Sequence, residues 1–310
     1  MIHIDFLVVF NQVLVLFSIL LLGFILRKIG IIDERGNKNF TNLIIYITLP
    51  ALIIISMDYD FSLERLVMMR TTLIISAGIY IGMIIISYVI IKLLHPSPKS
   101  DEDIYQFMII FANTAYIGFP VIQVIYGGEG IFLGAIYNVI LNLVLWTLGI
   151  VIMERRKGEG AKITIKAILN PGIVSVVIGF LIFILSIDLP GPIKDAISMV
   201  GGVTSPLALI VVGSTLSQVK IGGTFTNIRL WIVSVIRQVV IPIIALFILR
   251  GFNIDPLILG VAVILTAMPV AAMTAIFAQE FRGDSALASE GVFLSTLLSM
   301  LTIPLVIQLL

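Results

Sequence analysis

The sequence predicts an all-α polytopic membrane protein with ten transmembrane helices. Three observations support this prediction: the composition, the number of apolar runs and the distribution of basic residues along the chain. Hydrophobic residues make up 59% of the 310 residues, charged residues only 12%, and the mean hydropathy is +1.17. A soluble domain carries about 25% charged and about 45–50% apolar residues. This chain is too poor in charge to build a water-facing surface, so we expect it to lie in a lipid bilayer.

Ten apolar runs of roughly the length that crosses a bilayer, about 20 residues, are bounded by charges or by glycine and proline clusters. The weakest separations are the short polar break "DYDFSLER" and the tight turn "YGGEG". The predicted spans are 6–26, 40–57, 70–91, 104–126, 130–153, 168–187, 193–217, 229–249, 256–279 and 286–309. The opening "MIHID" lacks the basic region of a signal peptide, so the first run is predicted to be a retained span.

Lysine and arginine orient the predicted spans, because cytoplasmic loops carry an excess of both. With the N-terminus outside, fourteen basic residues fall in cytoplasmic loops and four (Arg65, Arg70, Lys194 and Arg250) in outer loops. The imbalance favours a multi-pass protein of the plasma or inner membrane with both termini outside, and it supports the count of ten.

The basic loop "ERRKGEGAKITIK" (154–166) divides the chain into 1–153 and 167–310, with five spans each. Since five is odd, the second half enters the membrane from the opposite side, which is the arrangement of an inverted repeat. The second span contains "TLPALII" at 48–54 and the seventh "TSPLALI" at 204–210, an offset of 156. The same offset carries Asn113 in span four onto Pro269 in span nine.

Helix-breaking residues interrupt several of these spans at corresponding places. They are Pro50, Gly118, Pro120, Pro206 and Pro269. Proline removes a backbone donor, and the carbonyls that it frees in lipid must find partners in protein or in a wet cavity. A simple kink is the alternative for any one proline. Paired breaks in spans four and nine instead indicate a midplane binding site where the two segments cross.

Four polar residues are the candidate substrate ligands. Asn113 and Thr114 lie in "FANTAYIGFP", where exposed helix N-termini would suit an anion. The alternative is that Asn113 only satisfies backbone groups freed by the break. Asn138 and Asn142 lie four residues apart and share one face of span five. Their alternative role is hydrogen bonding between helices.

Arg237 is the one basic residue deep inside a predicted span, which makes it a candidate gate or anion-binding charge, with Glu290 as a candidate partner. The alternative is that its side chain extends to the cytoplasmic face. No Asp or Glu lies near the middle of a span, which disfavours a carboxylate-based cation exchanger.

The chain offers little for other chemistry. It has no cysteine and two histidines, His3 and His95, and it lacks an H-E-x-x-H motif. We therefore predict no enzyme activity, no metal site and no cofactor. The net charge of +1 argues against a nucleic-acid partner.

Three stretches, "NLIIYITLPALII", "NTAYIGFP" and "TAMPVAAM", resemble the auxin efflux carrier family, which includes plant PIN carriers and bacterial permeases for small organic acids. The resemblance covers nearly the whole chain. It implies ten helices in two inverted repeats with helices four and nine broken and crossing. Spans one, two, six and seven would form a scaffold, and spans three to five and eight to ten a moving transport unit.

Carried over by position, the resemblance implies that Asn113, Asn142 and Pro269 occupy substrate-side or crossover positions. Ala112 stands where plant members have proline, and Val270 replaces a polar residue at the site. These departures favour a smaller organic anion over auxin as substrate.

The function expected is secondary transport of small organic anions by elevator-type alternating access. The partners expected are this anion and membrane lipid, with a homodimer through the scaffold helices as an open option. The alternatives are a sodium-coupled carrier of the bile-acid symporter type and, from another class, a membrane receptor or channel subunit.

Overall fold

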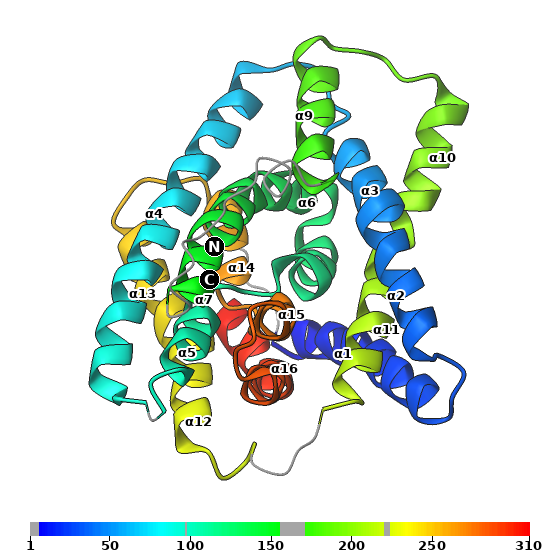
Figure 1. The fold of residues 1–310 in the computed structure, drawn as a ribbon. Coiled ribbons are helices and arrows are strands. Elements are labelled where there is room, and N and C mark those ends of the chain that lie inside the picture. Colours follow the sequence, from blue (N-terminus) through cyan, green and yellow to red (C-terminus); the bar gives the residue numbers. More distant parts are fainter. Residues whose placement is uncertain (1–5, 97, 156–170, 220–223) are drawn as a thin grey trace.

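The computed structural model describes residues 6–96, 98–155, 171–219 and 224–310, and in these ranges the chain is helical (Figure 1). Seven helical stretches are long and apolar enough to cross a membrane, and two shorter apolar helices accompany them. The prediction of an all-α, multi-pass membrane protein is confirmed at this level. Residues 156–166 of the predicted linker 154–166 lie outside the described ranges.

The helices follow the predicted spans closely. In the first half they are α1 (Phe6–Lys28), α2 (Glu34–Leu43), η1 (Ile44–Thr48), α3 (Leu49–Ser56), α4 (Leu63–Leu94), α5 (Asp101–Ile110), η2 (Thr114–Gly118), α6 (Phe119–Val144), η3 (Leu145–Gly149) and α7 (Ile150–Glu154). In the second half they are α9 (Pro171–Ile184), α10 (Gly191–Gly202), α11 (Thr204–Leu216), α12 (Ile228–Val235), η4 (Ile236–Val240), α13 (Ile241–Arg250), α14 (Pro256–Thr266), α15 (Met273–Glu280) and α16 (Ser285–Gln308).

The chain reverses within α6, although its backbone hydrogen bonding is almost continuous. Gly127 alone leaves the helical conformation there, with φ 61° and ψ −144°. A Cβ added at Gly134 would lie 3.2 Å from the Phe119 ring. A straight helix would separate these two positions by about 22 Å. The predicted turn "YGGEG" therefore separates two limbs, and the glycine supplies the positive φ that the reversal needs.

Prolines inside spans are accommodated by wide helical turns, because a π-turn shifts the hydrogen-bond ladder past the missing N–H. The π-helical turns η1, η2 and η4 end two residues before Pro50, Pro120 and Pro242. The expected helix breaks at Pro50, Gly118 and Pro120 are therefore corrected to continuous helical turns. Pro206 lies in the first turn of α11, just after the interruption at Val203.

Helices from both halves of the chain pack closely where glycine replaces a side chain. A Cβ at Gly213 of α11 would lie 1.8 Å from the backbone oxygen of Leu20, and one at Gly23 of α1 would lie 2.2 Å from that of Ile210. Small residues allow such backbone contact between membrane helices. Figure 1 shows α1 and α11 crossing beside α2, while α4, α5, α13 and α14 gather on the other side of the molecule.

Candidate functional site

Two interrupted helices meet through their backbones. Between α5 and η2 the chain is extended over residues 111–113, and between α14 and α15 it is non-helical over residues 267–272. Ala112 and Val270 form an antiparallel bridge. The Asn113 N–H donates to the Pro269 carbonyl at 2.8 Å, and the Ala271 N–H donates to the Phe111 carbonyl at 3.0 Å. We call these two segments, residues 111–113 and 267–272, the crossover.

The crossover leaves backbone donors of two helix starts without acceptors. The first N–H groups of any helix have no partner inside that helix. Within the described residues, no acceptor is present for the backbone N–H groups of Thr114, Ala115, Ala272 and Met273. The helix dipoles place partial positive charge at the same ends. Four backbone donors and two positive helix ends therefore converge on one place.

A cavity of about 220 Å³ lies against these donors. All four of the residues with free N–H groups line it, together with side chains of α3, the second limb of α6, and α9. Most of the lining is apolar or aromatic, including Phe119 and Trp146, and none of the described residues that line it is charged. The site can therefore enclose an apolar body and offer hydrogen-bond donors at one end.

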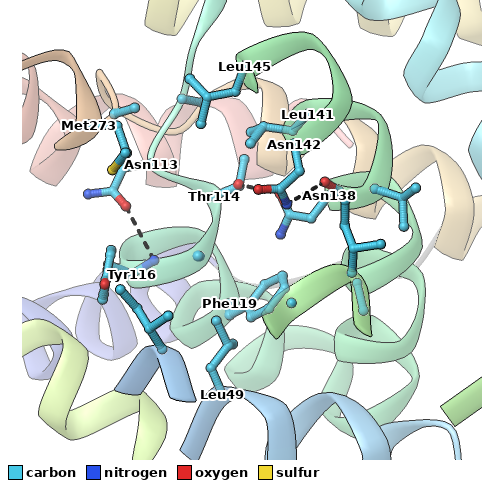
Figure 2. A pocket seen from close by; sticks show the side chains of 18 of the residues that line it. Leu49, Asn113, Thr114, Tyr116, Phe119, Asn138, Leu141, Asn142, Leu145 and Met273 are labelled. Carbon is cyan, nitrogen blue, oxygen red and sulfur yellow. Dashed lines mark hydrogen bonds between the residues drawn. The ribbon is translucent and has the colours of Figure 1, made fainter. Parts of the chain in front are cut away.

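Asn113 divides its amide between the backbone and the cavity. The side chain is 4% exposed and lines the cavity. Its Oδ1 accepts a hydrogen bond from the Tyr116 N–H at 3.2 Å, which caps η2 (Figure 2). Its Nδ2 has no partner among the described residues. The alternative role of satisfying freed backbone thus accounts for the oxygen of the amide and leaves the nitrogen available to a ligand.

Thr114, Asn138 and Asn142 form a polar group on the opposite wall of the cavity (Figure 2). The Thr114 hydroxyl donates to Asn138 Oδ1 at 2.5 Å, joining η2 to the second limb of α6. Asn142 Nδ2 donates to the Asn138 carbonyl at 2.8 Å, one turn back along its own helix. Asn138 therefore has the interhelical role that membrane amides commonly play, and both asparagines also face the cavity.

Of the expected site residues, Val270 and Arg237 do not line this cavity. Val270 is fully buried in the crossover bridge, where its N–H donates to Ser295 Oγ at 3.1 Å. Arg237 is 0% exposed, and its Nη1 donates to the Thr266 carbonyl at 2.8 Å. It does not reach the cytoplasmic face. Glu290 is not its partner, since that carboxylate acts on Tyr105 instead.

Some contributors to the site carry no signal in the sequence. The N–H groups of Ala115, Ala272 and Met273 belong to residues whose side chains suggest packing, and only the positions of the helix starts give them a role. Ser295 resembles any small residue at a helix interface, yet it satisfies a crossover donor. Proximity to Pro269 in sequence was the one available signal for Ala272 and Met273.

A larger cavity, of about 510 Å³, lies between α4 and α13. Its lining is almost entirely aliphatic, with Arg70 and Thr71 at one end. It contains neither the crossover nor the asparagines. Size alone would favour it, but the smaller cavity is the one that combines an apolar wall with unpaired donors, which is the usual character of a ligand site.

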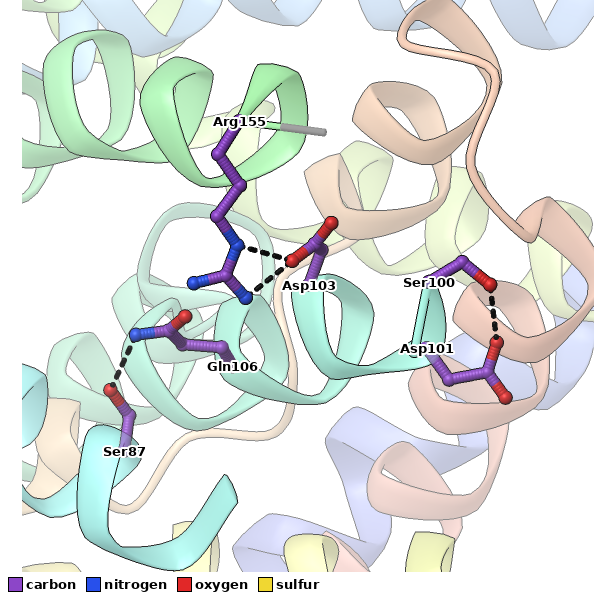
Figure 3. Close-up of polar contacts among 6 residues, drawn as sticks. All are labelled: Ser87, Ser100, Asp101, Asp103, Gln106 and Arg155. Atoms are coloured by element: carbon purple, nitrogen blue, oxygen red, sulfur yellow. Dashed lines mark hydrogen bonds and ion pairs between the residues drawn. The ribbon is translucent and has the colours of Figure 1, made fainter. Parts of the chain in front are cut away.

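Polar contacts also fix α5, the helix that leads into the crossover (Figure 3). The guanidinium of Arg155, just after α7, pairs with the buried carboxylate of Asp103, with Nε 2.5 Å from Oδ1. Gln106 Nε2 donates to Ser87 Oγ of α4 at 3.3 Å. Both contacts tie α5 to its neighbours on the side away from the cavity.

Interrupted membrane helices that cross over a partly polar cavity define the class of membrane transporters. The chain matches the model of the membrane transport protein family over residues 8–164 and 160–307. It is 27% identical over 299 residues to an uncharacterised transporter of Methanothermobacter thermautotrophicus, covering 95% of this chain and 96% of the relative. It is 26% identical over 311 residues to an uncharacterised transporter of Methanocaldococcus jannaschii, with the same coverage.

The chain therefore belongs to the membrane transport protein family, and the resemblance to auxin efflux carriers is confirmed at the level of the family.

Proposed function

We propose that this protein is a secondary transporter that moves small organic anions, carboxylates in particular, across the membrane by elevator-type alternating access. The observation that carries the proposal is the convergence of four unpaired backbone N–H groups and the free Asn113 Nδ2 on one uncharged cavity. Unpaired donors at helix N-termini are suited to an anion and leave a cation without ligands.

The lining of the cavity favours a monocarboxylate with an apolar body. Neutral donors can hold one carboxylate, whereas a second carboxylate would have to be buried without a cation beside it. The aromatic and aliphatic walls would instead cover a short hydrocarbon or aromatic group. We expect dicarboxylates and tricarboxylates to bind more weakly than monocarboxylates of similar size.

An inverted repeat of five spans in each half is supported by the positions of helix ends and glycines. The interrupted helices α5 and α14 end at Ile110 and Thr266, separated by the 156 residues that relate the two sequence motifs. Gly23 and Gly179 are related by the same offset. Each allows close packing of the first helix of its half, α1 against α11 and α9 against Met57 at the end of α3.

The ten spans of this proposal count the two limbs of α6 separately and join α14 to α15 across the crossover. Helices α1, α2–α3, α9 and α10–α11 would form the scaffold, and the remaining helices the transport unit. The cavity lies between them, lined by α3 and α9 on one side and by the crossover on the other. Sliding of one unit past the other would expose the site to each face in turn.

The basic loops favour a plasma or inner membrane location with both termini outside. Membrane lipid would surround the exposed aliphatic side chains of the outer helices, and a homodimer would use the scaffold.

The test is uptake of radiolabelled acetate, butyrate and benzoate by proteoliposomes containing the purified protein. We expect saturable uptake and counterflow by the wild type. The Asn113→Ala variant should lose this uptake while keeping its melting temperature within a few degrees. The matched control is Asn253→Ala, on an exposed loop, which should transport normally. Full uptake by Asn113→Ala would reject the site.

The same preparation separates the alternatives. A sodium-coupled carrier would lose uptake when sodium is replaced by potassium, and we expect no such loss. A receptor would bind carboxylates without counterflow, and a channel would pass them without saturation at comparable concentrations.

A further inference from the structure

Arg237 ends at the broken helix of the crossover without lining the cavity. It lies in η4, which packs against the core, and its side chain is 0% exposed. Nη1 donates to the carbonyl of Thr266, the last residue of α14, at 2.8 Å and lies 3.6 Å from the sulfur of Met83. Nε and Nη2 have no partner among the described residues.

The hydrogen bond from Arg237 completes the end of α14. The last four carbonyls of a helix lack partners inside it. Here the carbonyls of residues 263–265 accept from the N–H groups of residues 267 and 268, and the carbonyl of Thr266 accepts from Arg237. A helix C-terminus carries partial negative charge, which a cation at that position compensates. The guanidinium thus removes negative potential from one arm of the crossover.

The charge of Arg237 exceeds what this role requires. No acidic side chain in the described part of the chain forms an ion pair with it, and the groups that act on its charge are the hydroxyls of Tyr80 and Tyr137. Burial of a cation without an anionic partner is strongly unfavourable. Its positive potential therefore remains uncancelled inside the protein, close to the crossover.

A short backbone path joins this charge to the substrate site. Thr266 lies three residues before Pro269, whose carbonyl accepts the Asn113 N–H. Three residues span at most about 11 Å. The guanidinium is thus on the order of 10–15 Å from the unpaired donors of the cavity.

We propose that Arg237 is a positioning residue that makes the crossover selective for anions: it holds the end of α14 in place and supplies the fixed positive potential that an uncharged cavity lacks. This inference rests on the proposed function. At an effective dielectric of about 20, one charge about 12 Å away changes anion affinity by about tenfold, or about 1.4 kcal/mol.

The test compares carboxylates with their uncharged amides, using butyrate and benzoate against butyramide and benzamide in calorimetric titrations of the purified protein. Arg237→Gln keeps an amide N–H for the Thr266 carbonyl and removes the charge. We expect the carboxylate-to-amide affinity ratio to fall about tenfold in this variant and to be preserved in Arg237→Lys. A purely structural role would weaken both ligand types equally.

An unchanged ratio in a folded Arg237→Gln variant would overturn the inference. If that variant loses its cooperative melt, Arg237→Lys decides, since loss of carboxylate preference with the charge retained would also overturn it. Failure of the wild type to bind any of the carboxylates would reject the proposed function, whereas carboxylate binding with an unaltered ratio in the variant would reject only the role of Arg237.

Discussion

Replacing Asn113 with aspartate separates the two uses of its amide. Aspartate keeps an oxygen for the Tyr116 N–H, at present 3.2 Å from Oδ1, and is as good a helix N-cap as asparagine. It removes the Nδ2 donors, which have no partner in the described residues. Loss of one hydrogen bond to a charged acceptor weakens binding by about 1.5–3 kcal/mol, or about 10–150-fold.

Repulsion adds to this loss. A carboxylate about 5 Å from the bound carboxylate costs about 3 kcal/mol at an effective dielectric of about 20. We therefore expect benzoate binding to Asn113→Asp to weaken at least tenfold at pH 7.5, measured by calorimetry, with proteoliposome uptake abolished. Asn253→Asp, on an exposed loop, controls for the added charge. If Asn113→Asp binds benzoate as tightly as the wild type does, the residue is only a helix cap and the anion site lies elsewhere.

Three further predictions concern packing and polar contacts, each followed by the melting temperature. Gly213→Ala would place a Cβ 1.8 Å from a backbone oxygen of α1 and should destabilise by about 1–3 kcal/mol, whereas Gly202→Ala, with open space around it, should not. Arg155→Gln removes the partner of the buried Asp103 carboxylate; with Arg155 29% exposed, we expect about 3 kcal/mol, largely recovered by adding Asp103→Asn. Thr114→Val should cost about 1 kcal/mol by losing its side-chain hydrogen bond, and Thr114→Ser should not. Equal melting temperatures within any of these pairs would contradict the contact concerned.

The helical membrane fold could be predicted from the sequence because lipid leaves few choices. Apolar runs of span length must become helices, and the glycines of "YGGEG" had to separate two limbs, since only glycine adopts the φ of 61° found at Gly127 without strain. The pairing of spans four and nine also followed from sequence, because the offset of 156 placed Asn113 opposite Pro269, and their backbones are hydrogen bonded.

The exact place of each break could not be predicted. Proline signals that the hydrogen-bond ladder must change, but a π-turn can absorb the change without opening the helix, as it does before Pro50 and Pro120. The first interruption instead lies at residues 111–113, well before Pro120. The direction of Arg237 was equally inaccessible, since one helix position permits a path to the membrane surface or into the core, and the neighbours decide.

The distribution of satisfied and unsatisfied groups around the crossover is itself an argument for function. A break in mid-membrane exposes polar backbone that lipid cannot solvate. On the protein side, Ser295 and Arg237 satisfy the Val270 N–H and the Thr266 carbonyl. On the cavity side, the helix starts at Thr114 and Met273 keep their first N–H groups free. If the breaks served only to kink the helices, side chains of α3 or α9 would be expected to cap both ends. An uncapped pair facing a closed apolar cavity is instead what a carrier requires, because the substrate must supply the missing acceptors and leave again.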